Sequence, residues 1–325
     1  MTVGVIGGGA WGTALAQMIA SDGTPVRLWA REAEVVSAIN RDHINPMFLA
    51  GINLSPQIVA TLSGDDMAGC DLLLAVAPAQ HLRGALAGLP VGATPLILCA
   101  KGIEAGSKLL MSQVAAESCP NAPIAVLSGP TFAHEVAHGL PTAITLACED
   151  ATLAQKLSAG IARPSFRPYV STDVVGAEIG GAVKNVLAIA CGVVAGRGLG
   201  QNAGAALIAR GFAEMTRFGL ARGARAETLA GLSGLGDLVL TCSSTTSRNF
   251  SLGKGLGAGR TAADLMADRR TIAEGAFTAP VLQAAARDAG VDMPVVDAVC
   301  ALLSGEVQID AVISALLSRP LKAEV

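Results

Sequence analysis

Lys184 stands in the middle of one of the most apolar segments of the chain. Residues 176–192 read GAEIGGAVKNVLAIACG, with Asn185 directly after the lysine. If the segment is a helix, the residues three and four positions before Lys184 are glycines, so no bulky side chain covers that face. A buried, unpaired ammonium is costly or loses its proton, although a lysine in a helix more commonly extends to solvent beside other charges. We therefore expect Lys184 to extend into a cavity that holds an anion or requires a proton.

A carboxylate in the second half of the chain is the expected partner of this lysine. Asp237 lies in the segment LGDLVL at 235–240, where apolar neighbours indicate that its side chain is half buried. A half-buried carboxylate requires a cation or a hydroxyl group, and we expect Lys184 to supply the cation. Paired in this way, the lysine would be held in place for proton transfer.

A Ser/Thr-rich segment follows shortly after Asp237 and ends in two further polar residues. It reads SSTTSRN at 243–249 and places hydroxyl groups next to Arg248 and Asn249. A guanidinium group binds phosphate through paired hydrogen bonds, so this segment can wrap a small anion. A plain surface loop has the same composition, and the segment alone does not distinguish the two.

The start of the chain carries a glycine pattern that suits a dinucleotide. Gly7, Gly9 and Gly12 match GxGxxG between a predicted strand at 2–6 and a predicted helix at 13–20. The first glycine permits the tight turn, the second lets backbone amides approach a pyrophosphate, and the third allows the helix to pack closely on the strand. Because the pattern lies between a strand and a helix, we predict dinucleotide binding rather than an ordinary turn.

The end of the second predicted strand leaves the choice of cofactor open. An acidic residue often holds the adenosine ribose there, whereas this chain reads VRLWAR at 26–31 and presents Arg31. A guanidinium group at this place suits the 2′-phosphate of NADPH. Glu32 or Glu34 can still hold a ribose, and Arg31 can equally be a solvated residue at a helix start, so NADH is retained as an alternative.

The segments around these residues predict an α/β protein with two domains. Short apolar runs alternate with helix-like stretches, which is the pattern of a Rossmann-type, doubly wound parallel sheet. After the first strand, these runs lie at 26–29, 72–76, 95–100 and 124–127. Long Ala/Gly/Leu-rich segments then replace the alternation. We predict a dinucleotide-binding domain at 1–175 and an all-helical substrate-binding domain at 176–325.

The segment His134-Glu135-Val136-Ala137-His138 matches the HExxH pattern of zinc metalloproteases. Two histidines four positions apart on a long helix can bind zinc, with the glutamate as general base. Here glycine and proline on both sides leave about two helical turns, and the following GLPTAIT contains no third ligand. We predict a short surface helix whose histidines face solvent, with no metal site, and keep a metalloprotease as a remote alternative.

The composition argues against several classes of protein. Of the 325 residues, 51% are hydrophobic but only 3% are aromatic, so stacking surfaces for nucleic acid are not expected. The net charge of −3 also disfavours a nucleic-acid partner. No uninterrupted apolar run reaches the roughly eighteen residues that span a bilayer, and the seven cysteines form no CxxC pair. We expect a cytoplasmic protein with reduced cysteines and without membrane insertion.

With these motifs in view, the chain closely resembles the NAD(P)-dependent glycerol-3-phosphate dehydrogenase family in its bacterial form. The likeness covers essentially the whole chain and rests on five blocks in the family's order. They are GGGAWGTALA at 7–16, AKGIE at 100–104, SGPTFAHEVA at 128–137, GGAVKNVLAI at 180–189, and GLGDLVLTC with SRN across 234–249. The resemblance implies reversible reduction of dihydroxyacetone phosphate to sn-glycerol 3-phosphate, a glycerophospholipid precursor, by NADH or NADPH.

The resemblance also implies roles for individual residues. Lys184 would be the general acid and base at the C2 oxygen, Lys101 would polarise that oxygen beside the nicotinamide, and Asp237 would belong to the same catalytic set. The other substrate contacts implied are Gly129, Thr131, Thr241, Ser247, Arg248 and Asn249. Besides the glycine pattern and Arg31, the cofactor contacts implied are Trp11, Lys101, Ala133, Arg248 and Glu274. No metal is implied.

Two positions depart from the family's commonest pattern. His134 stands where members often carry lysine, and Ala10 where serine is frequent, but neither touches the implied chemistry. The alternatives are a related two-domain dehydrogenase for another small hydroxy acid and a non-catalytic nucleotide sensor. Arg248 favours a phosphorylated substrate over a carboxylate, and a sensor has no use for a Lys184–Asp237 pair. The Ala/Gly-rich helices would allow a homodimer.

Overall fold

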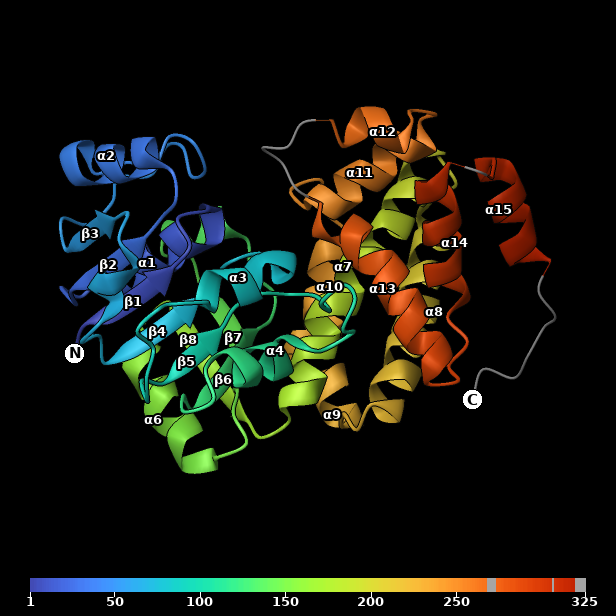
Figure 1. Ribbon diagram of the computed structural model, residues 1–325. Coiled ribbons are helices and arrows are strands. Elements are labelled where there is room, and N and C mark those ends of the chain that lie inside the picture. The colour runs from blue at the N-terminus through green and yellow to red at the C-terminus, as the bar shows by residue number, and fades with distance from the viewer. Residues whose placement is uncertain (268–272, 306, 319–325) are drawn as a thin grey trace.

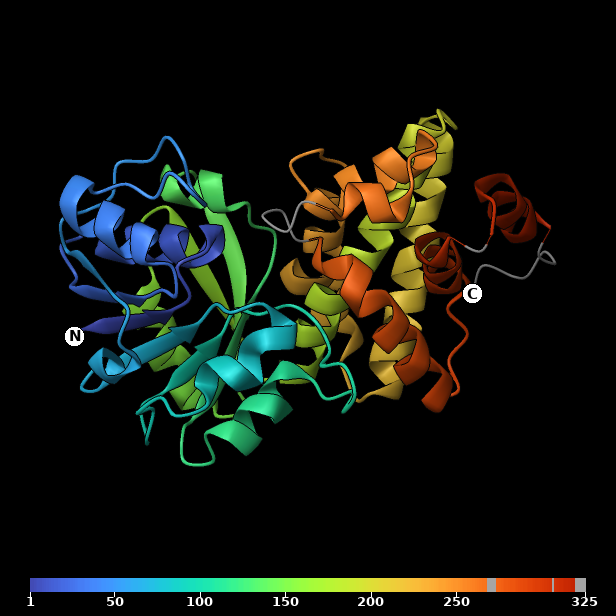
Figure 2. The ribbon, with the colours of Figure 1, turned by 45° about the horizontal axis from the view of Figure 1, so that its top comes forward.

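The computed structural model describes residues 1–267, 273–305 and 307–318, and it consists of two lobes that lie side by side (Figure 1). The N-terminal lobe contains the sheet and the C-terminal lobe consists of helices, as Figure 2 shows from a second direction. The last strand ends at Ser171 and the first helix of the second lobe begins at Val174. The domain boundary predicted between residues 175 and 176 falls in the first turn of this helix.

The N-terminal lobe contains an eight-stranded sheet with the order β3-β2-β1-β4-β5-β6-β7-β8. The strands are β1 (Val3–Ile6), β2 (Val26–Trp29), β3 (Ile58–Thr61), β4 (Leu72–Ala75), β5 (Leu96–Leu98), β6 (Ile124–Ser128), β7 (Thr142–Ala147) and β8 (Phe166–Ser171). The pairings among β1 to β6 are parallel, β7 runs antiparallel to β6, and β8 runs parallel to β7. The predicted α/β fold class with a doubly wound, mostly parallel sheet is confirmed, and the antiparallel pairing of β6 with β7 is a feature that the sequence did not indicate. The connection from β6 to β7 contains the five-residue helix α5 (Ala133–Ala137), which is too short to carry the chain back along the sheet.

Helices cover both faces of this sheet because successive strand residues point to opposite faces. In β4, Leu72 and Leu74 belong to one core cluster, and Leu73 and Ala75 belong to the other. The first cluster includes residues of α1 (Ala10–Ala20), α2 (Ala33–Asp42) and α6 (Ala151–Ile161), and the second includes residues of α3 (Leu82–Leu86) and α4 (Met111–Ser118). Two 3₁₀ helices, η1 (Gly64–Met67) and η2 (Ala79–His81), lie in the connections.

The second lobe is built around one long buried helix, α7 (Val174–Gly196). Asp173 caps its N-terminus by accepting a hydrogen bond from the backbone N–H of Gly176 at 2.8 Å, and every residue from Gly176 to Val193 is buried. The other helices are α8 (Gln201–Ala221), α9 (Ala226–Ala230), α10 (Asp237–Cys242), α11 (Arg248–Gly257), α12 (Ala262–Leu265), α13 (Glu274–Asp288), α14 (Pro294–Ser304) and α15 (Ile309–Leu317). A short π-helical segment, η3 (Leu232–Gly236), leads into α10.

Within the described ranges, α7 is also the one helix long and apolar enough to cross a membrane. The sequence prediction counted only uninterrupted apolar runs. Because Lys184 and Asn185 interrupt the apolar segment at 174–196, that prediction did not single it out. In the structure, 83% of the most apolar window of α7 is buried inside the protein, which is the environment of a core helix.

Candidate active site

Lys184 and Asp237 form a buried ion pair in the C-terminal lobe. The Nζ of Lys184 lies 2.6 Å from Oδ1 of Asp237, and it donates a second hydrogen bond to Oγ1 of Thr241 at 3.0 Å. The side chain of Asp237 is fully buried, and that of the lysine is 7% exposed. The pairing expected from the sequence is therefore present.

The glycines before Lys184 make room for a neighbouring backbone segment. A Cβ atom on Gly180 would lie 2.3 Å from the carbonyl oxygen of Ser233 in η3, so any side chain at this position would prevent the approach. Because η3 lies so close to α7, Asp237 at the start of α10 is placed against Lys184. The space left by the missing side chain at Gly180 is filled by the backbone that leads to the carboxylate.

Lys101 brings a second ammonium group to the same carboxylate from the N-terminal lobe. It follows β5, and its Nζ lies 2.7 Å from Oδ2 of Asp237 and 3.1 Å from the backbone oxygen of Gly129. Its aliphatic stem packs on α7 at Gly181, where a Cβ atom would lie 3.2 Å from Cγ of the lysine. Asp237 therefore bridges one lysine from each lobe.

This cluster contains one carboxylate for two ammonium groups. Burial lowers the pKa of Lys184 to about 8, Asp237 opposes the shift, and the charge of Lys101 adds to it. A lysine with this pKa can both donate and accept a proton close to neutral pH. The excess of positive charge also attracts an anionic substrate.

Glu274 lies within electrostatic range of the same cluster. It is the first residue of α13 and is partly buried. Burial raises the pKa of its carboxyl group, and the positive charges of Arg248, Lys101 and Lys184 oppose the shift. The structure thus brings together two predicted cofactor contacts, Arg248 and Glu274, with the two lysines.

Asn249 connects three helices around the lysine cluster. Its Oδ1 accepts a hydrogen bond from the backbone N–H of Gly275 at 2.9 Å, and its Nδ2 donates to Oδ1 of Asn185 at 3.0 Å. Asn249 therefore ties α11 to α7 beside Lys184 and to the first turn of α13. Its neighbour Arg248 is exposed at the N-terminus of α11, where its guanidinium group is accessible to an anion.

The hydroxyl groups predicted to contact substrate already have partners within the protein. Ser247 accepts a hydrogen bond from the backbone N–H of Phe250 at 3.2 Å and so caps α11. Thr131 donates to the backbone oxygen of Gly129 at 3.3 Å, in the turn after β6. Since Gly129 also accepts from Lys101, Gly129 and Thr131 belong to the lysine cluster, whereas Ser247 supports the helix that presents Arg248.

The glycine pattern forms the turn between β1 and α1, as predicted. Gly7 has a φ angle of 124°, which favours glycine, and a Cβ atom on Gly12 would lie 1.9 Å from the backbone oxygen of Gly7. A Cβ atom on Gly9 would meet no atom within 4 Å, so the space above this glycine is open. The turn therefore fits a pyrophosphate at the N-terminus of α1.

The other predicted cofactor residues of the N-terminal lobe lie near this turn or at the carboxyl end of β2. Trp11 and Ala133 pack against the same core cluster, one from α1 and one from α5. Arg31 follows β2, its side chain is 73% exposed, and its Nη2 lies 3.8 Å from Glu32. An exposed guanidinium group at this strand end is available to a 2′-phosphate.

The HExxH segment is a surface feature. The helix that carries it, α5, has five residues, and both His134 and His138 are exposed. Nδ1 of His138 lies 2.8 Å from the backbone oxygen of His134. Over residues 1–267, 273–305 and 307–318, no group of three or more His, Cys, Asp or Glu side chains is placed to hold a metal ion. The prediction of a short surface helix with exposed histidines is confirmed.

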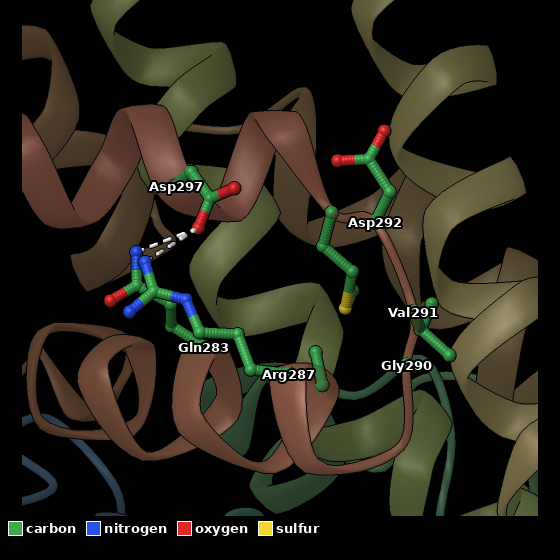
Figure 3. Close-up of a pocket in the computed structure, with 8 residues that line it drawn as sticks. Gln283, Arg287, Gly290, Val291, Asp292 and Asp297 are labelled. Atoms are coloured by element: carbon green, nitrogen blue, oxygen red, sulfur yellow. Dashed lines mark hydrogen bonds and ion pairs between the residues drawn. The ribbon is translucent and has the colours of Figure 1, made fainter.

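A hollow of about 360 Å³ lies between α13 and α14, away from the lysine cluster (Figure 3). Figure 3 shows Gln283 and Arg287 directed toward Asp297, and Nε2 of Gln283 donates to Oδ1 of Asp297 at 2.7 Å. Arg287 lies 3.7 Å from the same oxygen. Because these polar side chains are satisfied by one another, the hollow does not present the chemistry of the lysine cluster.

Sequence reasoning missed the residues that follow β4. Pro78 and His81 line a second hollow of about 180 Å³, with Glu274 and Phe277 on its other side. No motif marks Pro78, His81 or Phe277. The rule that ligands bind at the carboxyl ends of parallel strands would have directed attention to the first two.

Comparison with known proteins agrees with this arrangement along the whole chain. The family model for the NAD-dependent glycerol-3-phosphate dehydrogenase N-terminus matches residues 2–154, and the model for the C-terminus of the same family matches residues 173–314. Glycerol-3-phosphate dehydrogenase [NAD(P)+] 1 of Sphingopyxis alaskensis is 65% identical, with 99% of this chain and 97% of that protein covered. The corresponding protein of Erythrobacter litoralis is 64% identical over the same shares of the two chains.

A solved structure extends the likeness to the fold. The crystal structure of glycerol-3-phosphate dehydrogenase from Coxiella burnetii is similar with a TM-score of 0.93 and 34% identity, covering 98% of this chain and 99% of that chain. The glycine turn, the lysine cluster and the helical lobe thus occur together in a chain that belongs to the NAD-dependent glycerol-3-phosphate dehydrogenase family.

Proposed function

We propose that this protein reduces dihydroxyacetone phosphate to sn-glycerol 3-phosphate with NADH or NADPH, and catalyses the reverse reaction. The observation that carries the proposal is the buried Lys184–Asp237–Lys101 cluster between the two lobes, in a chain whose family has this activity in its name. The cluster supplies a proton donor and positive charge, which are the two requirements for reducing the carbonyl group of an anionic substrate.

Lys184 is assigned as the general acid and base. In the direction of reduction its ammonium group donates a proton to the C2 oxygen, and in the direction of oxidation the neutral amine removes the proton of the C2 hydroxyl. Its pKa of about 8 suits both directions. Asp237 holds the ammonium group in position, and Lys101 adds positive charge where the C2 oxygen becomes an alkoxide.

The substrate phosphate is assigned to the N-terminus of α11. Arg248 is exposed there and can bind a phosphate through two parallel hydrogen bonds. Backbone N–H groups at a helix N-terminus favour an anion, and Asn249 fixes this helix end to α7 beside the general acid. The phosphate site and the proton donor are therefore held in one rigid arrangement.

The cofactor is assigned to the glycine turn, whose open space at Gly9 fits a pyrophosphate. When bound, it supplies the hydride that the side chains of the protein cannot provide. Trp11, Ala133, Glu274 and Arg31 are the further proposed contacts. The exposed Arg31 permits a 2′-phosphate, so we propose that both NADH and NADPH are used.

The initial rate of NADH and NADPH oxidation tests this assignment. It should be measured with dihydroxyacetone phosphate and with unphosphorylated dihydroxyacetone, each in the presence and absence of a chelator. We expect chelator-insensitive oxidation that requires the phosphate group. Equal rates with the two substrates would contradict the role of Arg248, and no oxidation with either cofactor would contradict the function.

We also propose that the protein acts in the cytoplasm and supplies glycerol 3-phosphate for glycerophospholipids. The seven cysteines are free thiols and most are buried, as in proteins of reducing compartments. Fractionation of cells that express a tagged chain would test the location, because recovery in a membrane or secreted fraction would contradict it.

A further inference from the structure

A cleft between the lobes contains an aromatic side chain to which the mechanism above gives no role. This cleft is the second hollow described above, with a volume of about 180 Å³, and it lies between η2 of the N-terminal lobe and the first turns of α13. Pro78 and His81 line one wall, and Glu274 and Phe277 line the other. Phe277 is 50% exposed, whereas the next residue of α13, Thr278, is buried.

This cleft adjoins the lysine cluster. Gly102 follows Lys101, and a Cβ atom on Gly102 would lie 2.7 Å from Cβ of Ala79 in η2 and 3.4 Å from Oγ1 of Thr278 in α13. The two walls of the cleft therefore meet at the residue next to Lys101. A ring bound in the cleft lies beside the segment that carries the ammonium group assigned to the C2 oxygen.

The cleft also adjoins the glycine turn. β1 leads into that turn, and its neighbour β4 leads toward η2. A Cβ atom on Gly7 would lie 3.1 Å from the backbone oxygen of Val76, which directly follows β4. In doubly wound sheets a dinucleotide crosses the carboxyl ends of the strands where the strand order reverses, here between β1 and β4. If the adenosine lies at the end of β2, the other end of the dinucleotide extends toward the cleft.

We propose that Phe277 is a cofactor-binding residue that packs against the nicotinamide ring in this cleft, with Pro78 on the opposite wall. The proposal rests on the function proposed above. A flat heterocycle packs favourably on a phenyl ring, and the carboxylate of Glu274 can accept a hydrogen bond from the carboxamide N–H. Phe277 therefore contributes to affinity for the nicotinamide half of the cofactor and not for the adenosine half.

Equilibrium binding without substrate tests this role. The affinity for NADH or NADPH is measured from the change in cofactor fluorescence on titration with the wild-type protein, Phe277→Ala or Phe277→Tyr. The affinity for ADP-ribose or its 2′-phosphate, which lack the nicotinamide, is measured by calorimetry. We expect Phe277→Ala to weaken the reduced cofactor about three- to tenfold and to leave the ADP-ribose compound unaffected. Phe277→Tyr keeps the ring and should bind like wild type. Leu220, at 51% exposure on α8, provides the matched control Leu220→Ala, which should change neither affinity.

Three outcomes would overturn the proposal, and a fourth would contradict the proposed function. An unchanged affinity of Phe277→Ala for the reduced cofactor would overturn the proposal, as would an equal loss for the ADP-ribose compound. If Phe277→Ala fails to fold, Phe277→Leu replaces it: this variant keeps apolar bulk but lacks the flat ring, so wild-type affinity would again overturn the proposal. Failure of wild type to bind any of these ligands would instead contradict the proposed function.

Discussion

Asp237→Asn tests how the carboxylate sets the pH range of the reaction. The amide keeps the size of the side chain but removes the charge that opposes the lowering of the Lys184 pKa by burial. The Nζ of Lys184 and Oδ1 of Asp237 lie 2.6 Å apart, and an opposite charge this close shifts a pKa by about one to three units. We therefore expect the pKa of Lys184 in the variant to lie well below its wild-type value of about 8.

The direction of the effect on rate follows from the protonation state that each reaction requires. Reduction of dihydroxyacetone phosphate needs the ammonium form of Lys184, so kcat/KM should fall as the pH rises through about 8 in wild type. Oxidation of glycerol 3-phosphate needs the neutral amine, so its rate should rise through the same pH. In Asp237→Asn both midpoints should move to lower pH.

The assay is kcat/KM in both directions from about pH 5.5 to about pH 9.5 at constant ionic strength, because this ratio reports the pKa of the free enzyme. Arg248→Ala is the control. Arg248 is not among the groups that shift the Lys184 pKa, so its loss should lower the rate without moving the midpoint. An unchanged midpoint in Asp237→Asn would refute Lys184 as the titrating group.

Three further substitutions have separate expected outcomes. Lys184→Ala should lower kcat by about 10²- to 10⁴-fold while NADH binding, measured by fluorescence, stays close to wild type; a variant that retains most of its kcat would contradict the mechanism. Arg248→Ala should raise KM for dihydroxyacetone phosphate by about ten- to a hundredfold, and an unchanged KM in steady-state assays would mean that the phosphate binds elsewhere. Gly180→Ala should reduce the free energy of unfolding in urea by about 1–3 kcal/mol, because the added Cβ would lie 2.3 Å from the carbonyl oxygen of Ser233; wild-type stability would contradict this close approach.

The sequence predicted the central strands β1, β2, β4, β5 and β6 and missed β3, β7 and β8, which lie at or near the sheet edges. All four residues of β1 and of β4 are buried, which produces continuous apolar runs. At one edge, β3 buries only alternate residues and leaves Val59 58% exposed. At the other edge, β8 contains Pro168 and exposes Tyr169. Such short, half-exposed strands have too weak an apolar pattern to identify without their neighbours.

The candidate site was predictable to the extent that its chemistry is local. A lysine among glycines and a carboxylate among leucines each required a partner, and the structure joins them. That Lys101 shares the carboxylate depends on the packing of one lobe against the other, which no local pattern encodes. Ser247 has a role that its place beside an arginine did not indicate, since its hydroxyl group caps α11.

The buried position of α7 also affects how the chain is made. The helices that pack on it in the C-terminal lobe, α8, α10, α11, α13 and α14, all follow it in the sequence, so α7 is synthesised before any of them is complete. During that interval, a helix as apolar as a membrane span is exposed to water and to other chains. The segment that fixes Lys184 in the finished enzyme is therefore also apolar surface that the later helices must cover as the chain folds.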